Sequence, residues 1–197
     1  MPKIIKFSAF VYLDDTPVTH ILEVVTKLQK SYEIELIVLN TPDKSKVTNL
    51  TKEVKIREVP LTQYKIPFLR GLWYEIYLTL YILTSSEKID IIYSRLRPFS
   101  ISEYLIKFLK KIPVIVEVNG LLTEEIIMEI HAPSFFNPIL SRIVSFFEKR
   151  ALSASNKIIS VTSDIKNRLQ EAYNLPKDKI VIIENGVNTK LFKPIDK

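Results

Sequence analysis

The sequence predicts an α/β protein built on a mostly parallel, doubly wound sheet with helices on both faces. Short apolar runs alternate with longer amphipathic runs along almost the whole chain, which is typical of parallel strands joined by crossover helices. Residues 180–183 form an unbroken run of four apolar side chains, as in a strand buried on both faces. No internal repeat or linker interrupts this pattern, so the 197 residues predict a single Rossmann-like domain.

In the N-terminal half, turn-forming residues separate the predicted elements. Pro17 suits the first turn of a helix because that position needs no backbone N–H, and Asp15 or Thr16 can cap the helix. Residues 41–52 are polar, which indicates a loop or a weak helix. The strands predicted here cover residues 3–13, 33–39 and 54–59, and the helices cover residues 17–30 and 67–86.

The helix predicted over residues 67–86 is long and rich in aromatic side chains. Apolar residues recur along one of its sides, which we expect to pack on the sheet: Leu69, Leu72, Trp73, Ile76, Leu80 and Leu83. The helix carries more aromatic residues than one core face needs, so a patch that faces lipid or a partner is the alternative.

In the C-terminal half, the same alternation predicts four strands and three helices. The strands cover residues 90–94, 113–118, 157–161 and 179–183, and the helices cover residues 98–110, 138–153 and 163–173. The helix over residues 138–153 is amphipathic, and its apolar face carries Ile139, Leu140, Ile143, Val144, Phe147 and Ala151. An Asn-Gly pair ends the last strand, and glycine allows a sharp turn because it enters positive φ without steric cost.

The charge of the chain favours anionic partners. A formal net charge of +6 and a pI near 9.3 suit nucleic acid, anionic lipid or a phosphorylated substrate. The basic residues are too dispersed to favour nucleic acid, so we expect no nucleic-acid partner. Arg142, Lys149 and Arg150, with Phe146 near them, could form a basic and aromatic strip for peripheral membrane contact, although the solvated face of a packed helix is the simpler interpretation.

The composition excludes several kinds of chemistry. The chain has no cysteine, which excludes disulfides and thiolate catalysis. Its two histidines, His20 and His131, are too few for a zinc site without carboxylate ligands, so we expect no metal site. Few Gln and Met residues and abundant Ile, Lys and Glu indicate a thermophilic source.

The apolar segments predict neither a signal peptide nor a transmembrane helix. The N-terminal residues lack a small-residue cleavage site after an apolar core. The most apolar stretch, residues 68–83, contains Arg70 and Glu75 and is too short to span a bilayer. We therefore expect a cytoplasmic protein.

Candidate binding residues cluster where predicted strands end, which is where open α/β sheets bind their ligands. Arg95 and Arg97 follow one strand and could bind an anion, or they could form structural salt bridges. His20, near the start of the first helix, could contact a phosphate or a hydroxyl group, or lie on the surface. The first strand-to-helix turn, residues 14–19, contains no glycine, so a dinucleotide site is not expected there.

Further candidates follow the later strands. Asn119, Gly120 and Glu124 come after the strand over residues 113–118, and this group could supply a general base or a ligand for sugar hydroxyls. Glu124 could equally be a first-turn helix residue. Thr162 follows the next strand and is best interpreted as a helix N-cap.

Several of these segments together resemble the family 4 glycosyltransferases. Residues 90–95 (DIIYSR) resemble the family's DVIHSR strand, and residues 112–120 (IPVIVEVNG) resemble IPVVxExHG. Glu148 followed by residues 154–162 (ASNKIISVT) resembles the E…ADxVIxVS segment. Residues 179–194 (KIVIIENGVNTKLFKP) resemble the family's NGVD…F.P segment, which is the most specific of these matches.

The resemblance implies a retaining transfer of a sugar from a nucleotide-sugar donor, with no cofactor and no obligatory metal. It implies that the chain is the N-terminal, acceptor-side half of a two-domain GT-B fold and that residues 186–197 begin the interdomain linker. The absent C-terminal domain would hold the donor and the family's E-x7-E motif. The positions that match the family in substrate binding are His20, Arg95, Gly120, Thr162, Asn185 and Gly186.

Two departures from the family's pattern affect the expected site. The usual Gly-Gly pair of the first loop is absent at residues 14–17, and the histidine that often precedes Gly120 is replaced by Asn119. A catalytic histidine therefore cannot be assigned, and the catalytic residues stay unknown, with Asn119 and Glu124 as candidates.

We therefore expect the acceptor-side domain of a glycosyltransferase that acts on a glycan, a lipid or a small molecule and is inactive alone. Half of a split glycosyltransferase is one alternative. A non-catalytic binding or interaction module that keeps the fold is the other.

Overall fold

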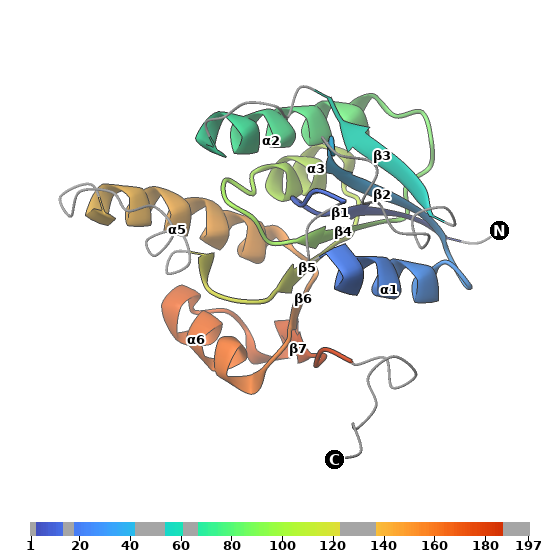
Figure 1. The fold of residues 1–197 in the computed structure, drawn as a ribbon. Coiled ribbons are helices and arrows are strands. Elements are labelled where there is room, and N and C mark those ends of the chain that lie inside the picture. Colours follow the sequence, from blue (N-terminus) through green and yellow to red (C-terminus); the bar gives the residue numbers. More distant parts are fainter. Residues whose placement is uncertain (1–2, 14–17, 42–53, 61–66, 123–136, 187–197) are drawn as a thin grey trace, which may run out of the picture.

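A computed structural model describes residues 3–13, 18–41, 54–60, 67–122 and 137–186 (Figure 1). The predicted features at residues 14–17, 42–53, 123–136 and 187–197, including Glu124, lie outside these ranges. One seven-stranded sheet forms the centre, and its strands are β1 (Ile4–Ser8), β2 (Glu33–Leu39), β3 (Lys55–Val59), β4 (Ile91–Arg95), β5 (Val114–Val118), β6 (Lys157–Ser160) and β7 (Ile180–Ile182). The strand order is β3-β2-β1-β4-β5-β6-β7, and every neighbouring pair is parallel, which confirms the predicted sheet.

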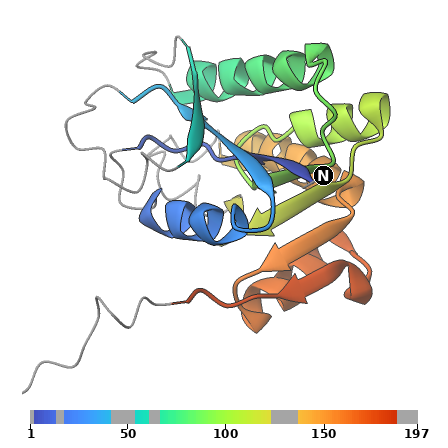
Figure 2. The same ribbon diagram turned by 90° about the vertical axis from the view of Figure 1, so that its right-hand side faces the viewer.

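Helices cover both faces of the sheet (Figures 1 and 2). They are α1 (Val18–Leu28), α2 (Pro67–Thr84), α3 (Ser102–Lys110), α5 (Asn137–Ala154) and α6 (Ser163–Tyr173), with a short 3-10 turn at Lys177–Lys179. On β2, Leu36 belongs to the core under α1, whereas its neighbour Ile37 belongs to the core under the other helices. Because successive strand residues point to opposite faces, this alternation confirms a doubly wound fold.

Most element boundaries agree with the prediction to within two residues, and β1 and α3 differ by more. The strand predicted over residues 3–13 ends as β1 at Ser8, although Ala9 still donates its N–H to the Ile37 carbonyl oxygen at 3.0 Å. The helix predicted over residues 98–110 begins at Ser102 instead. Phe99 has a left-handed φ of 61°, which ends any helical path through residues 98–101.

The side of α2 that packs on the sheet was predicted wrongly. Tyr74, Leu78 and Ile82 are fully buried, whereas Leu72 and Leu80 on the predicted core side are exposed. Tyr74 can replace an aliphatic residue in the core because its hydroxyl donates to the Ile37 carbonyl oxygen at 2.9 Å. The most aliphatic stripe of α2 is thus turned away from the sheet.

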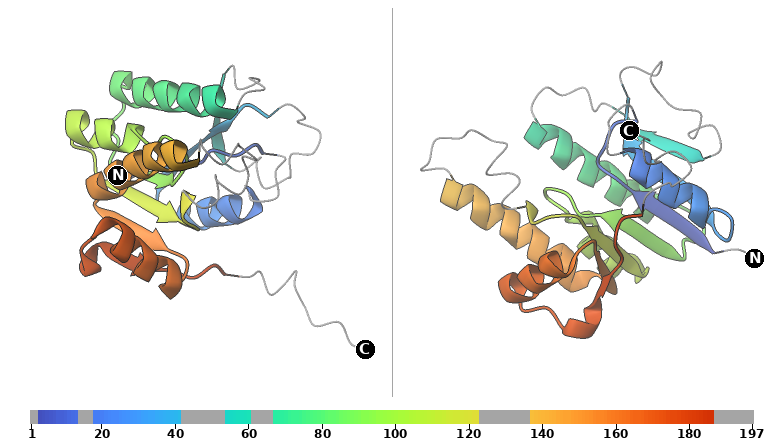
Figure 3. Two further views of the ribbon diagram at one scale, coloured as in Figure 1. Left: turned by 90° about the vertical axis from the view of Figure 1, so that its left-hand side faces the viewer. Right: turned by 60° about the horizontal axis from the view of Figure 1, so that its bottom comes forward.

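The apolar face predicted for α5 is only partly correct. Val144 and Ala151 are buried, but Ile139 and Ile143 are exposed. Figure 3 shows the reason: the N-terminal half of α5 extends beyond the end of the sheet, so it has no strand beneath it.

Strand β7 is not buried on both faces as the apolar run predicted. Ile180 is buried, but Val181, Ile182 and Ile183 are each at least 40% exposed. β7 is the edge strand of the sheet and pairs with β6 alone, so one row of its backbone groups and most of its side chains face outward.

Candidate functional site

A cavity of about 300 Å³ opens where α1 meets the carboxyl ends of β4, β5 and β6. The segment that follows β7 forms another wall of it. Residues from all these elements line the cavity: His20, Val24, Leu28, Tyr93, Glu117, Ile159, Val161, Ile183, Glu184, Asn185 and Gly186. Since every strand is parallel, all the strand ends lie at this edge of the sheet, where α/β proteins bind ligands.

Glu117 is the central polar group of this cavity. The Tyr93 hydroxyl donates a hydrogen bond of 2.6 Å to one of its carboxylate oxygens, and the Asn119 amide donates one of 3.0 Å to the other. Burial, together with the Glu117 carboxylate, raises the pKa of Tyr93 far above its usual value. Tyr93 therefore keeps its proton and holds Glu117 in a fixed orientation.

His20 faces the same carboxylate from α1. Its Nε2 atom lies 3.9 Å from Glu117 Oε1, which is an ion pair when His20 is protonated. Two of the predicted site residues, His20 and Asn119, thus meet at Glu117 although they are far apart in the sequence. The group can accept and donate hydrogen bonds around a polyhydroxylated ligand.

Asn185 and Gly186 lie in the wall of the cavity, as predicted for residues at a strand's carboxyl end. The sharp turn expected at this pair is wrong, because no described glycine has a positive φ. A Cβ added at Gly186 would meet no atom within 4 Å, so open space surrounds this position.

Arg95 and Arg97, predicted together as an anion site, have different surroundings. Arg95 is partly exposed and lines a second cavity, of about 180 Å³, with Phe10, Val11 and Pro98. Arg97 also borders this cavity, but only 3% of its side chain is exposed. For Arg97 the structure supports the second alternative, structural salt bridges, because carboxylates already neutralise its charge.

Those carboxylates are Glu75 of α2 and Glu103 of α3. Arg97 Nε lies 2.6 Å from Glu75 Oε1, and Arg97 Nη1 lies 2.7 Å from Glu103 Oε1. Glu75 also accepts hydrogen bonds from the backbone N–H groups of Ile101 and Ser102, at 3.0 and 2.9 Å. Burial raises the pKa of Glu75 to about 7; Arg97 opposes this rise and the Glu103 carboxylate adds to it. The cluster fixes the loop between β4 and α3.

Thr162 and Gly120 lie near strand ends but do not line either cavity described above. The Thr162 hydroxyl accepts a hydrogen bond of 3.2 Å from the Ile165 N–H, which confirms its interpretation as the N-cap of α6. Gly120 follows β5 and is partly exposed.

Tyr93 and Glu184 were not identified as site residues from the sequence, and Glu117 was noted only as part of its segment. A signal for Glu117 existed, because it is the only charged residue in the apolar strand β5. No local pattern could have indicated Tyr93, because its role depends on β4 pairing with β5.

Two further properties concern the described part of the chain. Its residues contain no group of three or more His, Asp or Glu side chains that could hold a metal ion. None of the helices described combines the length and the apolar character needed to cross a membrane.

The sheet order and the ligand-sized cavity at the strand ends define a Rossmann-like domain of the kind found in GT-B glycosyltransferases. The chain matches the sequence model of Glycosyltransferase Family 4 over residues 17–191, and it belongs to that family. The resemblance noted in the sequence is thereby confirmed. No curated protein matches the sequence significantly.

Solved structures show the same fold. Sucrose-phosphate synthase from Thermosynechococcus elongatus superposes with a TM-score of 0.67 and 12% identity, over 98% of this chain and 50% of that one. HepE from Anabaena, in complex with UDP and glucose, gives a TM-score of 0.65 at 13% identity, over 99% and 47%. A glycosyltransferase from Rickettsia africae gives 0.59 at 20% identity, over 96% and 44%. The chain thus spans about half the length of these proteins.

Proposed function

We propose that the chain is the acceptor-side domain of a retaining glycosyltransferase that moves a sugar from a nucleotide-sugar donor to an acceptor in the cytoplasm. The observation that carries this proposal is the cavity in which Tyr93 and Asn119 hold Glu117 opposite His20. Membership of the glycosyltransferase family supports it. The acceptor would be a glycan, a lipid or a small molecule with hydroxyl groups.

In this proposal the cavity residues bind and orient the acceptor. Glu117 accepts hydrogen bonds from acceptor hydroxyls, because its own position is fixed by Tyr93. His20, 32% exposed at the side chain, hydrogen-bonds the same ligand from α1. Arg95 offers a positive charge at the neighbouring strand end, where a donor phosphate could approach. No metal or other cofactor takes part.

A second domain would bind the donor, and the cleft between the two domains would be the active site. The length of the related structures, of which the chain spans about half, supports this arrangement. The second domain would follow the linker that begins at residues 186–197, or it would come from a separate polypeptide in a split enzyme. In either case the 197-residue chain alone transfers little or no sugar.

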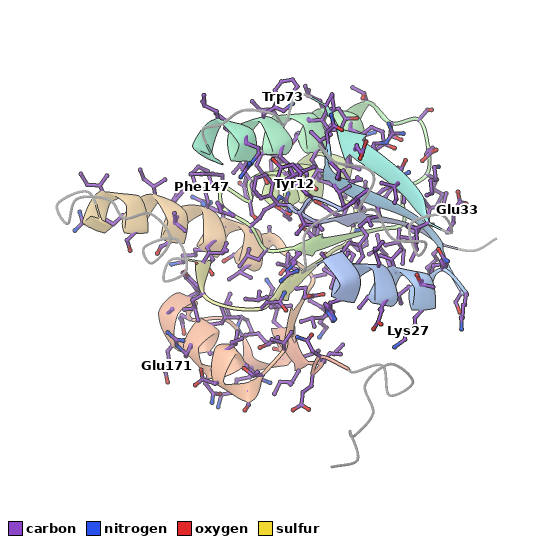
Figure 4. The ribbon with its side chains drawn as sticks, in the orientation of Figure 1. Tyr12, Lys27, Glu33, Trp73, Phe147 and Glu171 are labelled. Atoms are coloured by element: carbon purple, nitrogen blue, oxygen red, sulfur yellow. The ribbon has the colours of Figure 1, made fainter. Side chains whose placement is uncertain are left out.

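Transfer assays with a panel of nucleotide sugars test this proposal. We expect no turnover by the 197-residue chain, and turnover once it is joined to or mixed with a donor-binding domain. In the active assembly, Glu117→Gln and His20→Ala should each lower the rate of transfer. Glu171→Gln, at an exposed position on α6, is the control and should leave the rate unchanged (Figure 4). Turnover by the isolated chain would show that a second domain is not needed.

The alternative, a non-catalytic binding module, predicts a different result. The assembly would then bind acceptors at the cavity without releasing nucleoside diphosphate from any donor. The reading frame after codon 197 separates a continuous enzyme from a split one, since the former encodes a further domain with an E-x7-E motif.

A further inference from the structure

The outer sides of α2, α3 and α5 form one surface, which we call the helix-layer surface. The three helices lie side by side on the same face of the sheet, and α3 lies between the other two (Figures 1 and 3). Large apolar side chains point outward from all three helices, chief among them Leu72, Ile76, Leu80, Phe108, Ile143 and Phe146. Phe108 is 70% exposed and Phe146 is 53% exposed, which is unusual for aromatic side chains without a partner surface.

Charge is distributed unevenly across the helix-layer surface. The three carboxylates of these helices, on Glu75, Glu103 and Glu148, are each 1% exposed. Each is held inside by an internal partner: Arg97 pairs with the first two, and the Tyr173 hydroxyl donates to Glu148 at 2.7 Å.

Every exposed charged side chain described on these helices is basic. They are Lys110 at the end of α3 and Arg142, Lys149 and Arg150 on α5. On α5, Arg142, Phe146 and Lys149 recur at helical spacing, so cations and apolar side chains share one face.

Aromatic and cation–π contacts join α3 and α5. The Arg150 guanidinium lies 5.7 Å from the Tyr104 ring centroid and 5.2 Å from that of Phe146, and Tyr104 stacks on Phe108. Arg150 therefore connects α5 with α3 and keeps its charge among apolar groups.

Further aromatic contacts run from α5 towards α2. Phe146 contacts Phe147, with ring centroids 5.5 Å apart, and the ring centroids of Phe147 and Phe99 are 5.7 Å apart. The Phe99 ring lies against Gly71 of α2, where an added Cβ would approach it to 3.5 Å. Phe99 thus connects the aromatic side chains of α5 with α2.

We propose that the helix-layer surface docks the domain onto a bilayer that contains anionic phospholipid. Exposed apolar side chains enter the acyl boundary, and the surrounding Lys and Arg side chains pair with lipid phosphates. A second copy of the chain is a poorer partner for this surface, because symmetric pairing would bring the cations of the two copies together. This proposal is independent of the proposed sugar transfer.

Sedimentation of the 197-residue chain with lipid vesicles tests the proposal. We expect binding to phosphatidylcholine vesicles that contain phosphatidylglycerol, at least about tenfold weaker binding to phosphatidylcholine alone, and weaker binding as salt rises.

Two variants of the helix-layer surface should each weaken vesicle binding about tenfold or more. One combines Phe108→Ser with Phe146→Ser, and the other combines Arg142→Gln, Lys149→Gln and Arg150→Gln. The matched control combines Lys27→Gln, Lys30→Gln and Lys177→Gln, which removes the same charge outside this surface and should leave binding unchanged.

The results distinguish membrane docking from general charge attraction and from dimerisation. If the double phenylalanine variant unfolds by circular dichroism, the charge variant alone decides, since its side chains are exposed. An equal loss of binding in the control would overturn the proposal in favour of general charge attraction. No sedimentation with anionic vesicles at low salt would also overturn it, as would dimerisation in solution that the phenylalanine variant abolishes.

Discussion

At the residue scale, two charged groups at neighbouring strand ends have opposite roles. Glu117 borders a cavity and is held by the uncharged donors Tyr93 and Asn119, with 5% of its side chain exposed. Arg97 is enclosed by two carboxylates, so it stabilises a loop and is not free to bind an anion. The difference comes from the surrounding helices, since both residues occupy similar positions in the sequence pattern.

The cluster around Arg97 predicts a pH dependence of stability. Two buried carboxylates share one guanidinium, and burial raises the pKa of Glu75 to about 7. Between about pH 4.5 and pH 7 the Glu75 carboxyl is protonated in the folded protein, whereas in the unfolded chain it has already lost its proton. The free energy of unfolding therefore falls as the pH rises through this range. For a shift of this size, the loss amounts to roughly 3 kcal/mol.

Urea unfolding of Glu75→Gln between pH 5 and pH 8 measures this contribution. Gln imitates the protonated acid, so we expect the variant to show a smaller decline than the wild type and to be the more stable protein at pH 8. Glu171→Gln, on exposed α6, should retain the wild-type slope. Parallel slopes in the wild type and Glu75→Gln would contradict the assignment.

At the element scale, α2 buries the side that its aliphatic pattern does not predict. Tyr74 and Glu75 are buried because hydrogen bonds and an ion pair satisfy their polar atoms. The aliphatic stripe faces outward and forms part of the helix-layer surface. A hydrophobic pattern indicates which residues share a side of a helix, but it does not say which side meets the sheet.

Two substitutions on α2 test this orientation. Leu78→Ala should lower the free energy of unfolding by about 2–5 kcal/mol, because Leu78 is fully buried and its removal leaves a cavity. Leu80→Ala, two residues away and 56% exposed, should change it by less than about 0.5 kcal/mol. Denaturant unfolding measures both, and similar losses would show that α2 is rotated from the orientation described.

At the scale of the whole molecule, ion pairs join elements that are distant in the sequence. Lys6 is 1% exposed, and its Nζ lies 2.7 Å from Glu35 Oε2 and 2.5 Å from Glu87 Oε2. Arg57 Nε contacts the other oxygen of Glu35 at 3.1 Å. The network connects β1, β2, β3 and the loop between α2 and β4, and such networks contribute most at high temperature.

Composition and this network together predict a heat-resistant protein. We expect a thermal midpoint above about 65 °C by calorimetry. Arg57→Gln should lower the midpoint because it leaves Glu35 with fewer charged partners. Lys27→Gln, on the exposed side of α1, is the control (Figure 4). A wild-type midpoint well below that value would show that the composition does not indicate a heat-resistant protein.

The sequence by itself determined the order and type of the described elements and the family. Strand β2 and helix α6 have the predicted bounds, since apolar periodicity and turn residues are local properties. It also placed His20, Asn119 and Asn185 near strand ends, because parallel strands bring those ends to one edge.

Only the tertiary structure decided which charged groups are paired with opposite charges and which border a cavity with uncharged partners. The enclosure of Arg97, the hydrogen bond from Tyr93 to Glu117 and the outward stripe of α2 all depend on residues that are far apart in the chain. Burial and pairing are properties of the packed neighbourhood, and no local pattern records them.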